Sequence, residues 1–203
     1  MINIKGKGIQ KNEMKQFFLM TVGYSQTGKS TFIEKVLDKI PGIFVRVRSD
    51  DIRNFLNANY SVFKDDNTVK SKVYWPKEDT VKKIQGTLVE SMLKEGASIA
   101  LDSCNMVLKK RSENLRTVKN INPDIKTIIV RVKIPESKIY ENLKKADQEY
   151  ISRGEKPAWV DLYEKVQKGR FEEPSPEEAD YFIIYNWDNL DEVINKIKMV
   201  IIA

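Results

Sequence analysis

The residues best suited to chemistry form a glycine-bounded loop near the start of the chain. The loop fits the pattern G-x-x-x-x-G-K-[ST] in full, and its residues are Gly23, Tyr24, Ser25, Gln26, Thr27, Gly28, Lys29, Ser30 and Thr31. An apolar run over 17–22 precedes it and an amphipathic pattern over 32–37 follows, which is the strand–loop–helix context that the pattern requires. The glycines let successive backbone N–H groups point at phosphate oxygens, and the helix N-terminus adds positive charge. The sequence therefore predicts a binding site for a nucleoside triphosphate.

Two side chains of this loop have expected roles toward the triphosphate. Lys29 is expected on the β- and γ-phosphates, and the Ser30 hydroxyl is expected to complete the shell of a Mg²⁺ ion. The alternative is a plain strand–helix turn with a surface lysine, which the quality of both flanks disfavours. ATPases, GTPase switches and kinases all share such a loop, so the rest of the site must identify the reaction.

Carboxylates follow two further apolar strands of the predicted sheet. Asp50 follows the second strand, at the edge where the phosphate loop also lies, and can accept a proton from an attacking hydroxyl there. Alternatively, Asp50 only caps a helix and Arg53 is its surface ion-pair partner. Asp102 ends the third strand and is expected to reach Mg²⁺ through water, the alternative being a simple turn residue.

The phosphate loop followed by Arg48-Ser49-Asp50-Asp51-Ile52-Arg53 resembles the kinase domain of phage-type polynucleotide 5′-kinases. The resemblance implies that Asp50 is the general base and that Arg53 contacts a phosphate of the substrate. In that family an arginine often stands directly before the aspartate pair. This chain has Ser49 there, with Arg48 one position earlier.

Three later segments also resemble these kinases. Asn105 and Arg111 match an Asn-x-x-x-x-x-Arg stretch, which implies contacts to a nucleic-acid substrate; a solvated helix face is the alternative for 109–111. Arg153, in Arg153-Gly154-Glu155-Lys156-Pro157, resembles the lid arginine that closes over the triphosphate, where a guanidinium suits the developing charge. Phe171-Glu172-Glu173-Pro174 resembles a stretch shared with adenylyl-sulfate kinases.

Short apolar runs alternate with helical patterns along the chain, which is typical of a parallel sheet covered by helices on both faces. The expected strands are 17–22, 43–47, 98–101, 127–134 and 181–185. The sequence thus predicts an α/β P-loop kinase fold with about five strands in a mainly parallel sheet. Residues 1–16 are expected to form an N-terminal arm or edge strand, and residues 17–203 a single domain with a lid at about 151–159.

Composition excludes several kinds of site. Among 203 residues there is no histidine and one cysteine, Cys104, so histidine-dependent nucleophiles, histidine-ligated metals and thiolate zinc sites are excluded. Any metal is expected to be oxygen-bound Mg²⁺. No apolar run is long enough to cross a membrane, and a cytoplasmic location is expected. Trp159 and Trp187 are expected to pack internally, and Tyr60 and Phe63, with lysines nearby, either stack bases or pack locally.

The expected function is ATP-dependent transfer of the γ-phosphate to the 5′-hydroxyl of RNA or DNA. A surplus of 35 Lys and Arg over 29 Asp and Glu, a net charge of +6, favours a nucleic-acid partner modestly. One alternative is a P-loop kinase of a small-molecule hydroxyl, such as a nucleoside, a nucleotide, a sugar acid or adenylyl sulfate. The other is a nucleotide-gated binding module, against which stands the absence of an Asn-Lys-x-Asp motif.

Overall fold

The computed structural model describes residues 14–40, 44–56, 74–154 and 156–202, of which 74–77 are described by their backbone alone. Most of the expected N-terminal arm, at 1–13, lies outside the described residues. So do Tyr60, Phe63 and the rest of the segment 57–73.

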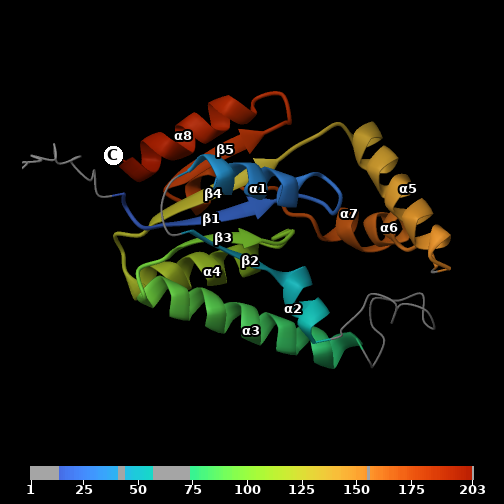
Figure 1. Cartoon of the computed structure of the whole chain (residues 1–203), viewed down its shortest axis with the longest axis horizontal. Helices are drawn as coiled ribbons and strands as arrows, with labels where there is room; N and C mark the ends of the chain where they lie inside the picture. The colour runs from blue at the N-terminus through green and yellow to red at the C-terminus, as the bar shows by residue number, and fades with distance from the viewer. Residues whose placement is uncertain (1–13, 41–43, 57–73, 155, 203) are drawn as a thin grey trace, which may run out of the picture.

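Five parallel strands form one sheet in the order β2-β3-β1-β4-β5 (Figure 1). The strands are β1 (Phe17–Val22), β2 (Phe44–Arg48), β3 (Ser98–Asp102), β4 (Lys126–Val132) and β5 (Tyr181–Tyr185). Leu19 of β1 lies opposite Ala100 of β3 and Ile128 of β4. This topology confirms the predicted α/β P-loop fold. The expected bounds of β1 and β5 are correct, and those of the other strands differ by one or two residues.

The central strand β1 explains why the sheet holds together. Its six residues are all buried, and it pairs with a strand on each side, so its continuous apolar run is what a parallel strand covered on both faces requires. Its side chains alternate between two cores. Phe17 and Leu19 face one core, and Phe18 and Met20 face the other.

Helices cover both faces of the sheet (Figure 1). Phe32 of α1 and Ile197 of α8 pack against one face, and Leu93 of α3 and Leu115 of α4 pack against the other. The helices are α1 (Lys29–Lys39), α2 (Ser49–Phe55), α3 (Tyr74–Lys94), α4 (Leu108–Ile121), α5 (Glu136–Ser152), α6 (Trp159–Leu162), the π-helix η2 (Tyr163–Gln167), α7 (Lys168–Arg170), the 3₁₀ turn η3 (Pro176–Glu178) and α8 (Leu190–Ile202).

The segment α5–α6–η2–α7, residues 136–170, projects beyond the carboxyl ends of the strands and is called the lid hairpin below (Figure 1). Asp147 of α5 accepts hydrogen bonds from the backbone N–H groups of Ala158, Trp159 and Val160 at 2.8, 2.8 and 3.1 Å, and so satisfies donors at the start of α6. The two arms of the lid hairpin are therefore braced against each other.

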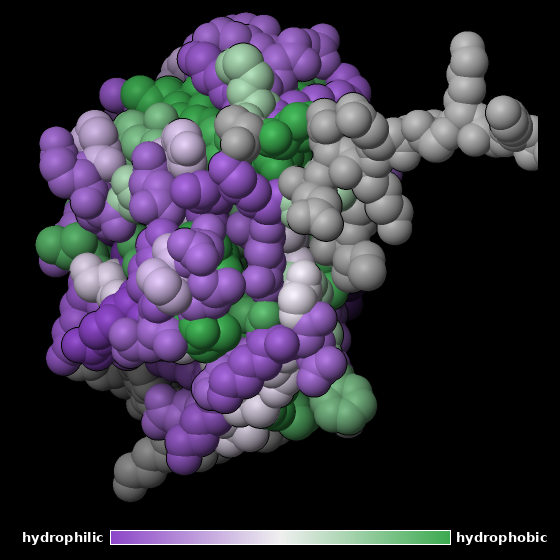
Figure 2. Space-filling model, turned by 90° about the vertical axis from the view of Figure 1, so that its left-hand side faces the viewer, coloured by the Kyte–Doolittle hydropathy of each residue, from purple (hydrophilic) through white to green (hydrophobic). Residues whose placement is uncertain are grey.

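The opposite end of the molecule, where the strands begin, has a mainly hydrophilic surface with apolar side chains in scattered groups (Figure 2). Among the described residues, no helix has both the length and the apolar character needed to cross a membrane.

Candidate active site

The phosphate loop joins β1 to α1, and a left-handed glycine starts the helix. Gly28 has φ 89°, a conformation that favours glycine, and it is the N-cap of α1. A Cβ atom at Gly28 would lie 2.8 Å from Nε1 of Trp187, so the position also has no room for a side chain. The loop therefore has the glycine-dependent geometry that a phosphate-binding turn requires.

Trp187 lies against this loop. The sequence analysis predicted internal packing for this residue. Its Nε1 donates a hydrogen bond to the carbonyl oxygen of Thr27 at 3.0 Å, its backbone has φ 73°, and the residue is 40% exposed. A non-glycine residue at such a φ is strained, and strain of this kind concentrates at functional sites. Trp187 thus holds the second half of the loop and leaves part of its ring open to solvent.

The lysine of the loop folds back onto the loop itself. Nζ of Lys29 donates a hydrogen bond to the carbonyl oxygen of Tyr24, and Thr27 Oγ1 donates to the same oxygen at 2.9 Å. Lys29 is 7% exposed. Its ammonium group therefore lies over the concave side of the loop, where phosphate oxygens would compete with a single carbonyl.

Tyr24 and Ser25, in the first half of the loop, contact the lid hairpin. Tyr24 also contacts Phe171, which follows the lid hairpin in the chain. The ring of Tyr24 lies 5.0 Å from that of Tyr163 and 4.5 Å from that of Phe171, centroid to centroid. Gln167 accepts a hydrogen bond from Ser25 N at 3.0 Å and donates one to Ser25 Oγ at 2.6 Å. Burial and a hydrogen bond to Glu136 raise the pKa of Tyr163 to about 12, so this hydroxyl keeps its proton at neutral pH.

A cleft of about 290 Å³ opens beside the loop, between the start of α1 and α5. Asn142 of α5 donates a hydrogen bond to the carbonyl oxygen of Gln26 at 2.8 Å and so joins α5 to the phosphate loop beside the cleft. The lining residues are Gln26, Gly28, Thr31, Asn142, Lys145, Ala146, Glu149 and Trp187. The cleft has the half-exposed indole of Trp187 on one side and polar groups on the other, which suits a flat aromatic ligand with a polar rim.

On the other side of the loop, the carboxyl ends of β2 and β3 present several charges, and this region is called the acceptor edge below. Arg53 of α2 donates to Oδ1 of Asp50 at 2.7 Å and to both carboxylate oxygens of Glu78, on α3, at 2.9 and 2.7 Å. Asp50 has a side chain that is 40% exposed, whereas the side chains of Arg53 and Glu78 are 13% and 11% exposed. The carboxylate expected to act as base is thus the accessible member of a charged trio.

Neutral side chains join the two strand ends of the acceptor edge. The hydroxyl oxygens of Ser49 and Ser103 lie 2.6 Å apart, and Nε2 of Gln85, on α3, donates to them at 2.8 and 3.1 Å respectively. Ser49 precedes Asp50, and Ser103 follows Asp102. This network therefore links the residues next to the two aspartates across the ends of β2 and β3.

Asp102 forms a buried ion pair and still has a carboxylate oxygen to offer. Arg46 donates two hydrogen bonds to Oδ2 of Asp102, at 3.0 and 2.6 Å, and Arg48 Nε lies 3.9 Å from the same oxygen. Burial works against the charge of Arg46, but hydrogen bonds to Asp102 and Glu34 outweigh it and raise the pKa of Arg46. Because the described contacts all fall on Oδ2, Oδ1 can accept a hydrogen bond from a metal-bound water.

These donors fit Mg²⁺ held mainly by a nucleotide. The described residues contain no group of three or more Asp, Glu, Cys or His side chains that could hold a metal without other help. Ser30 lies in the first turn of α1, next in the chain to Lys29 of the phosphate loop. One hydroxyl and one carboxylate acting through water suit Mg²⁺, which keeps several waters and binds phosphate oxygens.

Arg111, for which the resemblance implies contact with the substrate, is fully buried in this structure. The residue is 0% exposed, and its Nε and Nη2 donate to the carboxylate oxygens of Glu178 at 2.6 and 2.9 Å. Its Nη1 donates to the carbonyl oxygens of Asn105, Met106 and Glu172 at 3.0–3.1 Å. Arg111 therefore holds the segment after β3 in place and is a structural residue.

Asn105, the partner of Arg111 in the same expectation, also contacts backbone. Its Nδ2 donates to the carbonyl oxygens of Thr21 at 2.9 Å and Ser103 at 3.2 Å, and its φ is 47°. An asparagine tolerates this left-handed conformation better than most residues. The side chain joins the ends of β1 and β3 and lies close behind the phosphate loop, whose Gly23 N donates to Cys104 O at 3.1 Å.

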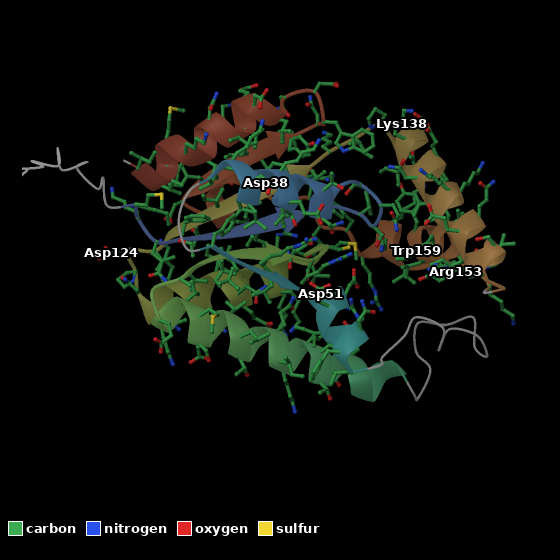
Figure 3. The ribbon with its side chains drawn as sticks, viewed as in Figure 1. Asp38, Asp51, Asp124, Lys138, Arg153 and Trp159 are labelled. Carbon is green, nitrogen blue, oxygen red and sulfur yellow. The ribbon has the colours of Figure 1, made fainter. Side chains whose placement is uncertain are left out.

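Arg153 lies at the tip of the lid hairpin, remote from the phosphate loop (Figure 3). It is the C-cap of α5, and its guanidinium carbon lies 4.8 Å from the ring centroid of Tyr150. Figure 3 shows Asp51, at the start of α2, well separated from Arg153 and Trp159 on the lid hairpin. In this structure the lid arginine and the carboxylates of the acceptor edge are therefore apart.

Four residues that contact the site were not predicted as site residues from the sequence. Gln167, Trp187, Glu78 and Gln85 each contact a site residue that lies at least 18 positions away in the chain. A glutamine or glutamate in a helix carries no local pattern that distinguishes it from a surface residue. Only Trp187 has an available signal, because it follows directly after the last strand, at the edge where ligands bind in parallel sheets.

Comparison with known proteins agrees with this fold. Residues 18–162 match the family model AAA_33, described as an AAA domain. A candidate kinase from Chloroflexus aurantiacus has a TM-score of 0.64 and 12% identity, over 92% of this chain and 96% of that one. The adenylyl-sulfate (APS) kinase CysC of Mycobacterium tuberculosis, solved with AMPPNP and APS, has a TM-score of 0.52 and 14% identity, over 94% and 99%. No curated protein matches the sequence.

The Pnkp1/Rnl/Hen1 complex matches with a TM-score of 0.47 and 21% identity, over 65% of this chain and 39% of that one. This TM-score is too low to support an argument about substrate. The comparisons therefore establish the domain family and the fold, and they leave the acceptor to be argued from the site itself.

Proposed function

The chain belongs to the AAA_33 family of AAA domains, and on this basis we propose that it is a P-loop kinase that transfers the γ-phosphoryl group of ATP to a hydroxyl of a small molecule. One observation carries the choice of acceptor. The two arginines that a polynucleotide reading requires both bind glutamates: Arg111 is buried against Glu178, and Arg53 pairs with Glu78. A small acceptor needs no row of phosphate-binding arginines.

In the proposed mechanism, ATP binds in the cleft on one side of the phosphate loop, and the acceptor binds at the acceptor edge on the other side. The nucleoside of ATP occupies the cleft beside Trp187, and the backbone N–H groups of the loop bind the triphosphate. The ammonium group of Lys29 exchanges the carbonyl of Tyr24 for the β- and γ-phosphate oxygens. Ser30, with Asp102 through water, would hold Mg²⁺, which neutralises charge on those phosphates when bound.

The transfer step assigns a role to Asp50. The acceptor hydroxyl oxygen forms a bond to the γ-phosphorus, the bond from that phosphorus to the β–γ bridging oxygen breaks, and ADP leaves. Asp50 takes the proton of the attacking hydroxyl, a role that its exposed carboxylate at the acceptor edge supports. Arg153 completes the site when the lid hairpin closes, where its guanidinium would stabilise the transferring group.

The 5′-hydroxyl of RNA or DNA is the second candidate acceptor. The placement of Arg53 beside Asp50, at 2.7 Å, favours it, because an arginine next to the base can bind the phosphate that follows a 5′-terminal ribose. That phosphate would have to displace Glu78 from Arg53. This requirement ranks the polynucleotide below the small-molecule acceptor.

The test measures label transfer from γ-labelled ATP with Mg²⁺ to both classes of acceptor. The panel contains sugars, sugar acids, nucleosides, nucleotides and adenylyl sulfate, together with 5′-hydroxyl RNA and DNA strands and their 5′-phosphorylated counterparts. We expect label on a small hydroxyl compound, lost in Lys29→Ala and Asp50→Asn and kept in the control Asp51→Asn. Label on the 5′-hydroxyl strands alone would establish the second candidate. ADP release with no labelled acceptor would contradict both and favour a nucleotide-gated switch.

A further inference from the structure

Gln167 binds the phosphate loop with both ends of its side-chain amide. Its Oε1 accepts the backbone N–H of Ser25 at 3.0 Å, and its Nε2 donates to Ser25 Oγ at 2.6 Å. Gln167 is 4% exposed, and Ser25 is 142 positions away in the chain. A buried amide that satisfies one residue of the loop twice fixes the position of that residue closely.

The local backbone around Gln167 is also unusual. Gln167 ends η2, a five-residue π-helix between the short α-helices α6 and α7. Such wide turns are rare and occur often at functional sites. Tyr163, at the start of the same turn, is 2% exposed and packs edge-on against Tyr24 of the phosphate loop. Both ends of η2 therefore contact neighbouring residues of the loop.

This turn is joined firmly to the rest of the lid hairpin. Glu136 of α5 accepts hydrogen bonds from Tyr163 Oη at 3.2 Å and pairs with Lys168 Nζ at 2.9 Å. Asp147 of α5 binds the start of α6, as described above. The unit that carries Arg153 at its tip thus carries Gln167 at its base, and a displacement of the lid hairpin acts directly on Ser25.

We propose that Gln167 is a positioning residue that holds the phosphate loop in its nucleotide-binding shape and couples it to the lid hairpin. Gln167 occupies the N–H of Ser25, so the N–H groups that follow it in the loop remain directed at the triphosphate. Without this amide, Ser25 loses two hydrogen bonds and keeps its contact with Cys104 Sγ at 3.6 Å. The ring and the carbonyl oxygen of Tyr24 and the N–H of Gly23 keep their contacts. The kinetic test of this inference rests on the proposed function, whereas the nucleotide-binding test does not.

The binding test uses the full chain and measures the affinity for Mg²⁺-ADP and Mg²⁺-ATP by titration calorimetry. Gln167→Ala should weaken both nucleotides by about tenfold, the loss expected for two hydrogen bonds at a site that must be ordered. The control Gln148→Ala, on the exposed side of α5, should bind as the wild type does. Wild-type affinity in Gln167→Ala would overturn the proposal. Binding of ADP needs no acceptor, so a failure to find any acceptor would contradict the proposed function alone.

A second variant separates positioning from packing. Gln167→Met nearly keeps the length and volume of the side chain, but a thioether cannot donate to Ser25 Oγ and accepts only weakly from Ser25 N–H. The affinity for ADP should therefore fall about as far as in Gln167→Ala. Wild-type affinity for ADP in Gln167→Met would mean that packing alone holds the loop and would contradict hydrogen-bonded positioning.

The kinetic readout distinguishes the loop from the acceptor edge. With any acceptor found by label transfer, Gln167→Ala should raise KM for ATP by about tenfold and leave KM for the acceptor unchanged. Equal increases in both KM values would indicate general loosening of the fold and would overturn the assignment.

Discussion

Arg53 and Arg111 have nearly the same partner chemistry and opposite surroundings. Each donates to both oxygens of a glutamate, Glu78 for Arg53 and Glu178 for Arg111, at 2.6–2.9 Å. Arg111 is fully buried, and its remaining donors bind three backbone carbonyls. Arg53 lies at the acceptor edge, where it also donates to Asp50, an accessible carboxylate.

This difference shows what separates a structural arginine from one that can take part in chemistry. The carboxylate of Glu178 neutralises the charge of Arg111, and three backbone carbonyl groups accept its remaining hydrogen bonds, so no donor of Arg111 is left for a ligand. Asp50 can exchange Arg53 for a proton or a substrate oxygen, because solvent and ligands reach it. A bidentate ion pair is therefore weak evidence of function by itself. The exposure of the arginine's other partners, high for Asp50 and low for the carbonyl groups around Arg111, distinguishes the two cases.

The largest expected effect concerns the buried arginine. Arg111→Ala leaves the Glu178 carboxylate without its ion-pair partner and removes one donor from each of three carbonyl groups, which should lower the free energy of unfolding by about 3–5 kcal/mol. Urea unfolding followed by circular dichroism measures this change. Arg116→Ala, on the exposed face of the same helix, should change it by less than about 0.5 kcal/mol. Unchanged stability together with a raised KM for the acceptor would mean that Arg111 does contact substrate.

These two arginines also mark the limit of what the sequence predicts. The phosphate loop and the central strand depend on local signals, a motif and a continuous apolar run, and the structure agrees with both. The spacing between Asn105 and Arg111 does not reveal which side of α4 faces the interior. Arg111 is buried because Glu178, 67 positions later, lies beside it. Gln167 and Trp187 were missed for the same reason, since their contacts with the loop depend on tertiary structure.

An intermediate effect is expected from the acceptor edge. Glu78→Gln keeps the shape of the side chain but removes the negative charge that pairs with Arg53. Arg53 should then pair more strongly with Asp50. We expect kcat for transfer to a small acceptor to fall by about tenfold, since a hydrogen bond between charged groups contributes about 1.5–3 kcal/mol. Steady-state kinetics would measure this change, with Asp79→Asn, an exposed neighbour on α3, as the control.

The same variant separates the two candidate acceptors. If a nucleic-acid phosphate binds Arg53, removal of the competing carboxylate should increase affinity for 5′-hydroxyl strands, and that affinity should fall steeply with added salt. Tighter binding of strands in Glu78→Gln, with faster transfer, would reverse our ranking of the acceptors. Slower transfer with no gain in strand binding supports the small-molecule reading.

The smallest expected effect tests the neutral network of the acceptor edge. Gln85→Ala removes the amide that donates to Ser49 and Ser103, while the hydrogen bond between these two hydroxyls, at 2.6 Å, remains. We expect a loss of about 1 kcal/mol in stability and a fall in kcat of about threefold, the scale of one neutral hydrogen bond. Lys83→Ala, exposed on α3, is the control.

The most informative result for Gln85→Ala is whether stability, kcat or both decrease. A loss confined to stability would mean that Gln85 only supports the packing of α3 on the sheet. A fall in kcat at an unchanged KM for the acceptor would mean that the separation of the β2 and β3 ends sets the position of Asp50. In that case the acceptor edge depends on two kinds of contact: ion pairs that exchange partners during transfer, and a neutral network that keeps their geometry while they do so.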